Sequence, residues 1–379
     1  MFEKLIIRRE DGVRLTGKPA LRKLVRAAGL RLVDADISNR PVVRSSVTFG
    51  YEDFASPRLT ELRRRYRLRR VVRAGKSQFQ QMLLLRNWVH HAVPRGRPAH
   101  FNLDALAILD SAARGGTFYC THYSFVMMQC ALALGWQARK LGIDRDHGRS
   151  ESSTHHGITE VWSDQYDKWI VFDAMFDVHY EKAGLPLNAL ELAEEWVENK
   201  GADVEIRRGP RRRRVAASGK RTEGFSEPGC YYWFHVYTRN NYFAIPERQG
   251  SYRYLLYEDA QRRRKTWYQG NPRTGKVHKH VGYGGLFLAT DAVEDVYWSI
   301  NRCQIDLSPG PKAETLTVVL DTFTPGLKGL YVSTDGKPRR KRTDRFTWSL
   351  HRGRNSLAVR AVNVLGVEGP VSSITLRCS

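Results

Sequence analysis

The chain has 379 residues, of which 41% are hydrophobic and 27% charged, which is enough apolar material for one large core or two ordinary ones. This composition excludes a disordered or collagen-like chain, and no segment approaches the roughly 18 consecutive apolar residues of a membrane span. The 62 Lys and Arg residues exceed the 39 Asp and Glu residues, so the formal net charge is +23, an excess that indicates either a solvated basic surface or an anionic partner.

The basic residues are scattered rather than gathered into one segment. Four runs stand far apart, at 63–65, 211–214, 262–265 and 339–342, and no nucleic-acid-binding motif accompanies them. We therefore expect an arginine-rich, solvated surface. An acidic polysaccharide or cell-wall polymer is the alternative partner, and nucleic acid is a less favoured one.

Cysteine use and the first residues indicate the compartment. The five cysteines, at positions 120, 130, 230, 303 and 378, include no C-x-x-C pair, so neither a disulfide framework nor a zinc knuckle is predicted. Residues 1–9 lack the apolar stretch of a secretory signal. We expect a cytoplasmic protein with no membrane association and no cofactor, or an extracytoplasmic one if a leader has been removed.

Residues 1–75 predict a mixed α/β segment. Apolar residues with helical spacing indicate helices over 21–28 and 57–71. An alternating stretch over 42–49 indicates a strand.

Residues 76–290 predict a central domain. The elements expected there are helices over 79–93, 102–113, 123–134 and 187–198, and strands over 138–143, 157–162 and 169–173. The basic segment 205–224 has few apolar residues and predicts a mobile loop. The segment 231–268 is rich in aromatic residues and predicts extended structure.

Residues 291–379 predict a β-sandwich. Short alternating runs recur there, each bounded by Gly, Pro, Asp or Asn. The stretch from Trp348 to Pro370 resembles the immunoglobulin-like or fibronectin-type modules attached to secreted bacterial enzymes. The whole chain is therefore expected to be an α+β protein with three domains, 1–75, 76–290 and 291–379.

Cys120 is the residue best placed for nucleophilic chemistry. It follows a Gly-rich turn and directly precedes a predicted helix, whose N-terminal N–H groups and dipole stabilise a thiolate. A thiolate nucleophile needs a proton donor, and His155 or His156 stands at the start of a predicted strand. These two point to opposite faces of the strand, so only one can serve. Asp173 closes the next strand, so in a hairpin its carboxylate can meet that histidine.

Four segments carry a resemblance to a known family. They are Gly116-x-x-x-Cys120, Ala131-Leu132-x-Leu134-Gly135-Trp136-x-Ala138-Arg139, His156-Gly157-Ile158-Thr159-Glu160-Val161-Trp162 and Trp169-Ile170-Val171-Phe172-Asp173. In this order they resemble the transglutaminase-like superfamily, whose members share a papain-like cysteine-protease core, over residues 76–180. The resemblance implies that Cys120 is the nucleophile, His156 the general acid/base and Asp173 the orienting carboxylate.

Three positions depart from the usual pattern of that superfamily. Ile158 stands where Trp is common, Ala174 where Pro is usual and Ser124 where a small Ala is typical. None of these changes removes a catalytic group. They leave the subfamily and the substrate open.

The resemblance implies a cysteine-dependent hydrolase or acyltransferase, of protease, amidase or transglutaminase type, with a thioester intermediate and a peptide or amide substrate. One alternative is a carbohydrate-active lyase or hydrolase that acts on an anionic polysaccharide in the same cleft, with His156 and Tyr119 as acid and base. Another is a non-catalytic binding protein that retains the fold. The triad and His122 also offer four zinc ligands, but their irregular spacing disfavours a metal site.

Four residues are expected to bind substrate, namely Tyr119, His122, Trp233 and Tyr242. The first two flank the nucleophile. The last two belong to the aromatic segment, which forms either core or a platform for stacking on sugar rings. An oxyanion hole is expected from the backbone N–H of Cys120 and a second donor among Asn87, Asn102 and Tyr119.

Overall fold

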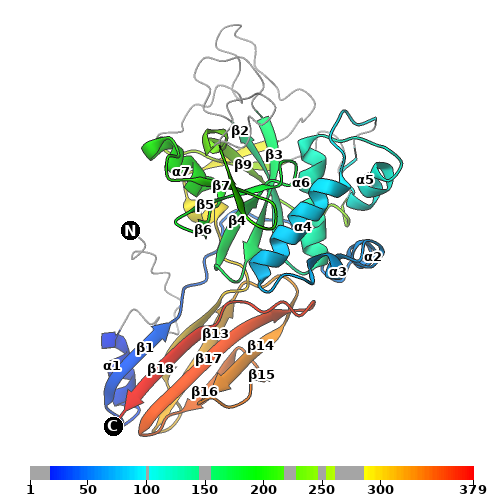
Figure 1. Cartoon of the computed structure of the whole chain (residues 1–379). Coiled ribbons are helices and arrows are strands. Elements are labelled where there is room, and N and C mark those ends of the chain that lie inside the picture. Colours follow the sequence, from blue (N-terminus) through cyan, green and yellow to red (C-terminus); the bar gives the residue numbers. More distant parts are fainter. Residues whose placement is uncertain (1–17, 100–101, 145–154, 217–227, 246–252, 261–285) are drawn as a thin grey trace. The chain divides into compact units, whose positions relative to one another are not determined.

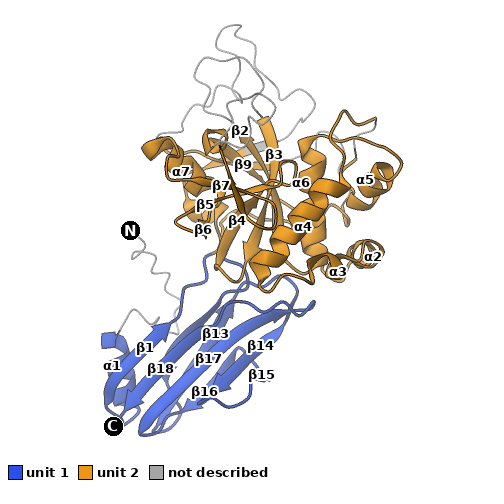
Figure 2. Cartoon of the chain, in the orientation of Figure 1, with its two compact units in different colours: residues 1–43, 299–379 blue, residues 44–298 orange. Residues whose placement is uncertain are grey.

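The computed structural model describes residues 18–99, 102–144, 155–216, 228–245, 253–260 and 286–379 (Figure 1). The chain divides into two compact units (Figure 2): unit 1 is residues 1–43 and 299–379, and unit 2 is residues 44–298. The domain boundary predicted after residue 290 lies near the boundary between the two units at residues 298 and 299. The predicted first domain, 1–75, is instead divided between the units, because β1 (Leu32–Ser38) pairs with β18 (Ser372–Cys378).

Unit 1 contains two antiparallel sheets that share one hydrophobic core. Their strand orders are β1-β18-β17-β14-β15 and β12-β13-β16. The remaining strands are β12 (Cys303–Pro309), β13 (Thr315–Thr322), β14 (Leu327–Thr334), β15 (Arg340–Arg342), β16 (Arg345–Ser349) and β17 (Gly353–Asn363). Ile305, Trp348 and Leu357 from both sheets pack in this core with residues of α1 (Lys18–Ala27). The predicted β-sandwich is confirmed, and its immunoglobulin-like or fibronectin-type identity stays a prediction.

Unit 2 is built on a six-stranded sheet with the order β11-β10-β9-β2-β3-β4. The strands are β2 (Ala138–Asp144), β3 (His155–Ser163), β4 (Lys168–Phe172), β9 (Trp233–Tyr237), β10 (Arg253–Tyr257) and β11 (Leu286–Thr290). All neighbouring strands are antiparallel except β10 and β11. Every residue of β2 is buried, so both faces of the sheet are covered at its centre.

The helix α6 (Cys120–Ala133) is the central helix of unit 2 (Figure 1). Its residues 121–133 are all buried, and it packs against β2 and β3. The helices α4 (Gln78–Ala92) and α5 (Ala105–Ala112) pack on α6. Further helices of unit 2 include α7 (Ala189–Asn199), η1 (Pro228–Tyr231) and α9 (Val293–Val296). No described helix is long and apolar enough to cross a membrane.

The helix predicted over 57–71 is two helices, α2 (Pro57–Arg65) and α3 (Leu68–Val72). Arg67 separates them in the left-handed region, with φ 49°. A non-glycine residue in that region ends a regular helix, and the apolar spacing of the sequence gives no sign of it.

The strand predicted over 42–49 does not form. The hydroxyl and the backbone N–H of Ser46 both donate to Asp295 Oδ1, each at 2.7 Å. The Ser45 hydroxyl donates to the carbonyl oxygen of Val47 at 3.1 Å. These bonds to side chains replace a strand ladder, as serine hydroxyls commonly do in turns.

The loop predicted over 205–224 is a hairpin at its start, and residues 217–224 lie outside the described residues. The strands β7 (Glu205–Arg208) and β8 (Arg213–Val215) join β5 (Val178–Lys182) and β6 (Leu185–Pro186) in a four-stranded sheet. Glu181 of β5 pairs with Arg212 at 2.6 Å and with Arg207 at 3.4 Å. The basic residues of the hairpin are therefore partly neutralised, which the composition of the segment alone does not reveal.

Candidate active site

Cys120 is the first residue of α6, and its side chain is half-buried. The capping residue, Tyr119, is extended and provides no side-chain hydrogen bond to the first turn. Burial would raise the pKa of the Cys120 thiol, but the hydrogen bond from His156, the charges of His156 and His155 and the N–H of Gly157 lower it to about 6. A thiol with this pKa is mainly thiolate at neutral pH and is therefore a strong nucleophile.

His156 lies near the start of β3, where it is paired with Ile143 of β2. Its Nε2 is 2.8 Å from Asp173 Oδ2, and both side chains are buried. Burial would lower the pKa of His156, but Asp173 and Cys120 raise it to about 10. An imidazolium between a carboxylate and a thiolate is an ion pair ready for proton transfer.

Asp173 follows β4, and the β3–β4 register pairs Phe172 with Thr159. This antiparallel pairing brings the end of β4 beside the start of β3, as the order of the two strands predicts. The backbone N–H of Phe176 donates to Asp173 Oδ1 at 3.2 Å. The carboxylate is thus held from both oxygens, one by the backbone and one by His156.

A second buried carboxylate, Asp177, supports the turn after Asp173. Its Oδ1 accepts from Arg86 Nε at 2.8 Å and its Oδ2 accepts from Asn87 Nδ2 at 2.7 Å. Arg86 is fully buried and also lies 2.7 Å from His179 Nδ1. Sequence reasoning missed this cluster. The one available signal is an arginine between Leu83 and Val89 on the apolar stripe of α4.

His155, the alternative to His156 as proton donor, lies on the other face of the sheet from His156. Its ring stacks on His235 with a centroid distance of 5.9 Å and an interplanar angle of 7°. Its Nδ1 is 3.5 Å from Asp144 Oδ2. A Cβ on Gly142 would overlap His235 and would lie 2.7 Å from the His155 ring, so glycine leaves room for this pair.

The residues expected to bind substrate are in different environments. Tyr119 is 48% exposed beside Cys120, whereas His122 is completely buried and burial lowers its pKa to about 4. Trp233 is half-buried against Tyr232. Tyr242 is buried with its ring edge-on to Phe125 at 4.6 Å. A platform for stacking on sugars needs an exposed ring face, and Tyr242 does not offer one.

The candidate oxyanion donors are also distinguished by their contacts. Asn87 donates to Asp177, as described above, and Asn102 is exposed, with its Oδ1 accepting from the N–H of Asp104 at 2.8 Å. The N-terminal turn of α6 supplies the backbone N–H of Cys120 itself. Tyr119 remains beside it as an exposed neighbour.

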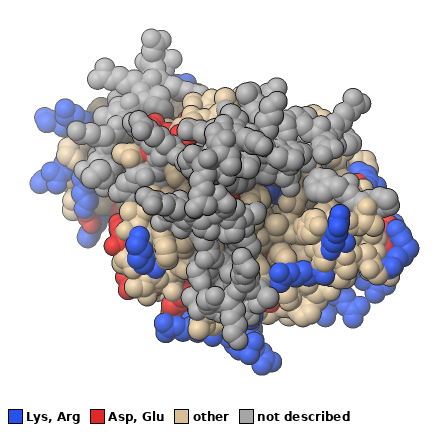
Figure 3. All heavy atoms as spheres, turned by 90° about the horizontal axis from the view of Figure 1, so that it is seen from above, with Lys and Arg blue, Asp and Glu red and all other residues tan. Residues whose placement is uncertain are grey.

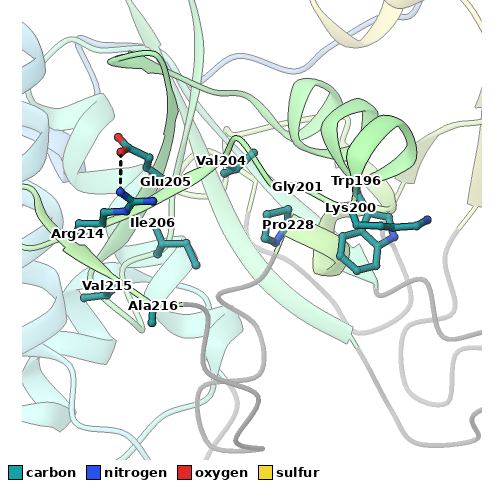
Figure 4. Close-up of a pocket in the computed structure, with 10 residues that line it drawn as sticks. All are labelled: Trp196, Lys200, Gly201, Val204, Glu205, Ile206, Arg214, Val215, Ala216 and Pro228. Atoms are coloured by element: carbon teal, nitrogen blue, oxygen red, sulfur yellow. Dashed lines mark ion pairs between the residues drawn. The ribbon is translucent and has the colours of Figure 1, made fainter.

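A pocket of about 560 Å³ lies elsewhere in unit 2 (Figure 4). It is lined by residues of α7, the β7–β8 hairpin and η1, including Trp196, Ile206 and Pro228. Glu205 and Arg214 form an ion pair of 3.6 Å in its wall. No residue of the triad lines this pocket, so it is not part of the candidate active site.

Basic side chains lie in separate groups on the face shown in Figure 3. This agrees with the dispersal of the basic runs, since 63–65 lies in α2, 211–214 in the β7–β8 hairpin and 339–342 at β15 of unit 1. The run 262–265 lies outside the described residues. In the part of the chain that is described, no three His, Cys, Asp or Glu side chains are grouped to hold a metal ion.

The family model of the transglutaminase-like superfamily matches residues 65–174. These residues belong to the transglutaminase-like superfamily. The matched segment contains Cys120, His156 and Asp173. The transglutaminase-like core therefore has the fold of a cysteine-based hydrolase or acyltransferase, while the match itself gives no specific reaction.

A solved structure similar to this chain is the crystal structure of red sea bream transglutaminase. The two are 12% identical over 97% of this chain and 79% of that chain, with a TM-score of 0.24. A similarity at this TM-score carries no argument about fold or function. A comparison with curated proteins found no match.

Proposed function

We propose that the protein is a cysteine-dependent hydrolase or acyltransferase that forms a thioester on Cys120. The observation that carries this proposal is the chain of contacts from the half-buried Cys120 through the buried His156 to the buried Asp173. The pKa of the thiol is lowered to about 6 and that of the imidazole is raised to about 10. Between these values the thiolate and the imidazolium coexist, which is the reactive form of such a pair.

The reaction follows from these two groups. The Cys120 thiolate attacks the carbonyl carbon of an amide, and His156 gives its proton to the leaving amine as the C–N bond breaks. His156, now neutral, takes a proton from water or from an acceptor amine, which attacks the thioester carbonyl. The C–S bond then breaks, and the thiolate and imidazolium are restored. Asp173 holds the imidazole in the orientation that both steps need.

The N-terminal turn of α6 would stabilise the oxyanion of both tetrahedral intermediates. The N–H groups of a first helical turn have no partner within the helix, and that of Cys120 lies beside the attacked carbon. The N–H of Gly157 bonds the sulfur of Cys120 and is therefore engaged with the nucleophile itself. The exposed Tyr119 is the candidate for a first contact with substrate.

Peptides and amides are the proposed substrates, and the anionic polysaccharide alternative has less support. Stacking on sugar rings would need exposed aromatic faces, but Tyr242 is buried against Phe125. The contact of His156 with Cys120, which lowers the pKa of the thiol to about 6, favours an enzyme over a non-catalytic protein with this fold. The superfamily fold and this thiol together favour the enzyme.

The rate of Cys120 alkylation by iodoacetamide against pH tests the proposal, with mass spectrometry to locate the adduct. We expect an apparent thiol pKa near 6, rising toward the ordinary value of about 8.5 in His156→Ala. Cys130→Ala is the matched control. Cys130 lies on the same helix, and burial raises its pKa, so its removal should change nothing. An ordinary thiol pKa in the wild type would overturn the thioester mechanism.

A further inference from the structure

Asp173 begins a short turn, residues 173–178, that closes on itself. The backbone N–H of Asp173 donates to the carbonyl oxygen of Val178, and that of Val178 donates to the carbonyl oxygen of Asp173, each at 3.0 Å. The turn contacts the imidazole of His156 twice, through the Asp173 carboxylate at 2.8 Å and through the Phe176 ring, at a centroid distance of 5.4 Å. The position of this turn therefore determines where both groups meet the imidazole.

The 173–178 turn needs support from outside. Asp177 has φ 53°, in the left-handed region that costs free energy for a residue with a Cβ. Its side chain is buried, and a buried carboxylate is stable only with a countercharge and hydrogen-bond donors. The turn therefore keeps this conformation only because neighbouring residues stabilise it.

The helix α4 provides this support for Asp177. Arg86 Nε and Asn87 Nδ2 donate to the two carboxylate oxygens of Asp177, at 2.8 and 2.7 Å. Arg86 is fixed in turn, because it also donates to His179 Nδ1 at 2.7 Å and to the carbonyl oxygen of Gly209 at 3.3 Å. Asp177 is thus bound to a guanidinium that is itself held on two further sides.

The same helix holds the first half of the turn through His90. The Nδ1 atom of His90 lies 3.2 Å from the carbonyl oxygen of Ala174 and 3.1 Å from that of Met175. Both partners are acceptors, so Nδ1 carries the proton and donates to them. His90 stands four residues after Arg86, so the two side chains project from one face of α4. The helix therefore contacts the turn near its start and near its end.

The helix α4 also packs against α6, the helix that begins with Cys120. Its apolar stripe, which includes Met82 and Val89, is buried. One helix thus contacts both the helix of the nucleophile and the turn of the orienting carboxylate.

We propose that Arg86, Asn87 and His90 position the 173–178 turn and, through it, the imidazole of the triad. This inference rests on the proposed function and adds three residues that the triad does not include. None of the three is part of the chain of contacts from Cys120 to Asp173. They act through Asp173 and are therefore positioning residues.

A positioning role and a purely structural role predict different results. If these contacts only stabilise unit 2, their loss lowers the free energy of unfolding and leaves the folded triad unchanged. If they position the turn, their loss also changes the pKa values of the thiol and the imidazole in a protein that is still folded. Urea unfolding of each variant gives the first quantity, and the two tests below give the second.

The first test replaces His90, because removing one partner of the buried Arg86–Asp177 ion pair is strongly destabilising. His90→Leu removes the donor to the two carbonyl oxygens, whereas in His90→Asn the amide Nδ2 takes the place of the imidazole Nδ1. We expect His90→Leu to slow Cys120 alkylation by iodoacetamide about threefold to tenfold at about pH 5, which corresponds to a rise of about 0.5–1 in the thiol pKa. His90→Asn should restore the rate to within about twofold of the wild type.

His91→Leu is the matched control for this test. His91 is the next residue of α4, is exposed, and its Nδ1 bonds the carbonyl oxygen of Asn87 in its own helix at 2.8 Å. It makes no printed contact with the turn, and its replacement should leave the alkylation rate unchanged.

The second test measures the contact between His156 and Asp173 without the thiol. The pKa of His156 is followed by NMR of ¹³C-labelled histidine in Cys120→Ala, with and without Asn87→Ala. Asn87→Ala removes one donor to Asp177 and keeps the Arg86 ion pair, so the buried carboxylate retains its countercharge. We expect the pKa of His156 to fall by about 0.5–1, because a displaced carboxylate stabilises the imidazolium less.

The outcomes separate this inference from the proposed function. Unchanged pKa values of the thiol and the imidazole in folded variants overturn the inference and leave the triad in place. A slower alkylation that His91→Leu reproduces, or that His90→Asn fails to restore, also overturns it, because the loss would then not depend on the donor to the turn. An ordinary thiol pKa in the wild type overturns the proposed function, whereas the second test still decides whether α4 positions Asp173.

Discussion

His156 Nε2 lies 2.8 Å from Asp173 Oδ2 in a site where both side chains are at most 2% exposed. In such surroundings the interaction between an imidazolium and a carboxylate is strong, because little water screens it. The contact leaves Nδ1 as the ring nitrogen that can bond Cys120. Asp173 therefore fixes both the orientation of the ring and the charge that it carries.

Asp173→Asn should lower activity by about a hundredfold or more, because the amide leaves the imidazolium without its countercharge. The fold should persist, since asparagine has the same size and its Oδ1 can still accept from the N–H of Phe176. The thiol pKa measured by alkylation should rise in parallel. Full activity with an unchanged thiol pKa would show that Asp173 only packs against His156.

The proposed hydrolase or acyltransferase activity should have a broad plateau in its dependence on pH. Below about 6 the Cys120 thiolate takes up a proton and loses its nucleophilicity. Above about 10 His156 loses the proton that the leaving amine needs. The ratio kcat/KM, measured on an amide substrate, should therefore rise through the first value and fall through the second. A maximum confined to pH 8–9 would instead indicate an ordinary thiol.

Much of the candidate site could be predicted from the sequence because its parts are local. The start of α6, the start of β3 and the end of β4 each follow from short patterns around Cys120, His156 and Asp173. Antiparallel pairing of consecutive strands then brings the last two together. The structure has this arrangement, and the catalytic roles remain the proposal made above.

The parts that could not be predicted depend on contacts between distant segments. Arg86 meets Asp177 across 91 positions, and Ser46 meets Asp295 across 249. Residue patterns describe which face is apolar, but they do not reveal which carboxylate accepts a buried guanidinium.

Glu160→Gln should destabilise unit 2 by about 3–5 kcal/mol, because it leaves a buried charge uncompensated. Arg139 Nη2 and Glu160 Oε2 are 2.6 Å apart and neither side chain is exposed. The guanidinium also lies 4.2 Å from the centre of the Trp169 ring. Urea unfolding followed by tryptophan fluorescence would measure the loss. A comparable change at an exposed pair, Lys18 and Asp34, should leave the free energy of unfolding almost unchanged, because water screens that pair.

Gly142→Ala should destabilise unit 2 by about 1–3 kcal/mol, the usual cost of overpacking. The added methyl group would overlap the His235 ring and lie 2.7 Å from that of His155, so the stacked pair must separate. The matched control is Gly157→Ala on the adjacent strand, where the methyl group would meet Thr121 Cα at an ordinary 3.4 Å. The control should change the unfolding free energy by less than about 0.5 kcal/mol. It also keeps the hydrogen bond from the backbone N–H of residue 157 to the Cys120 sulfur. Equal losses in the two variants would mean that the stacked histidines do not depend on the glycine between them.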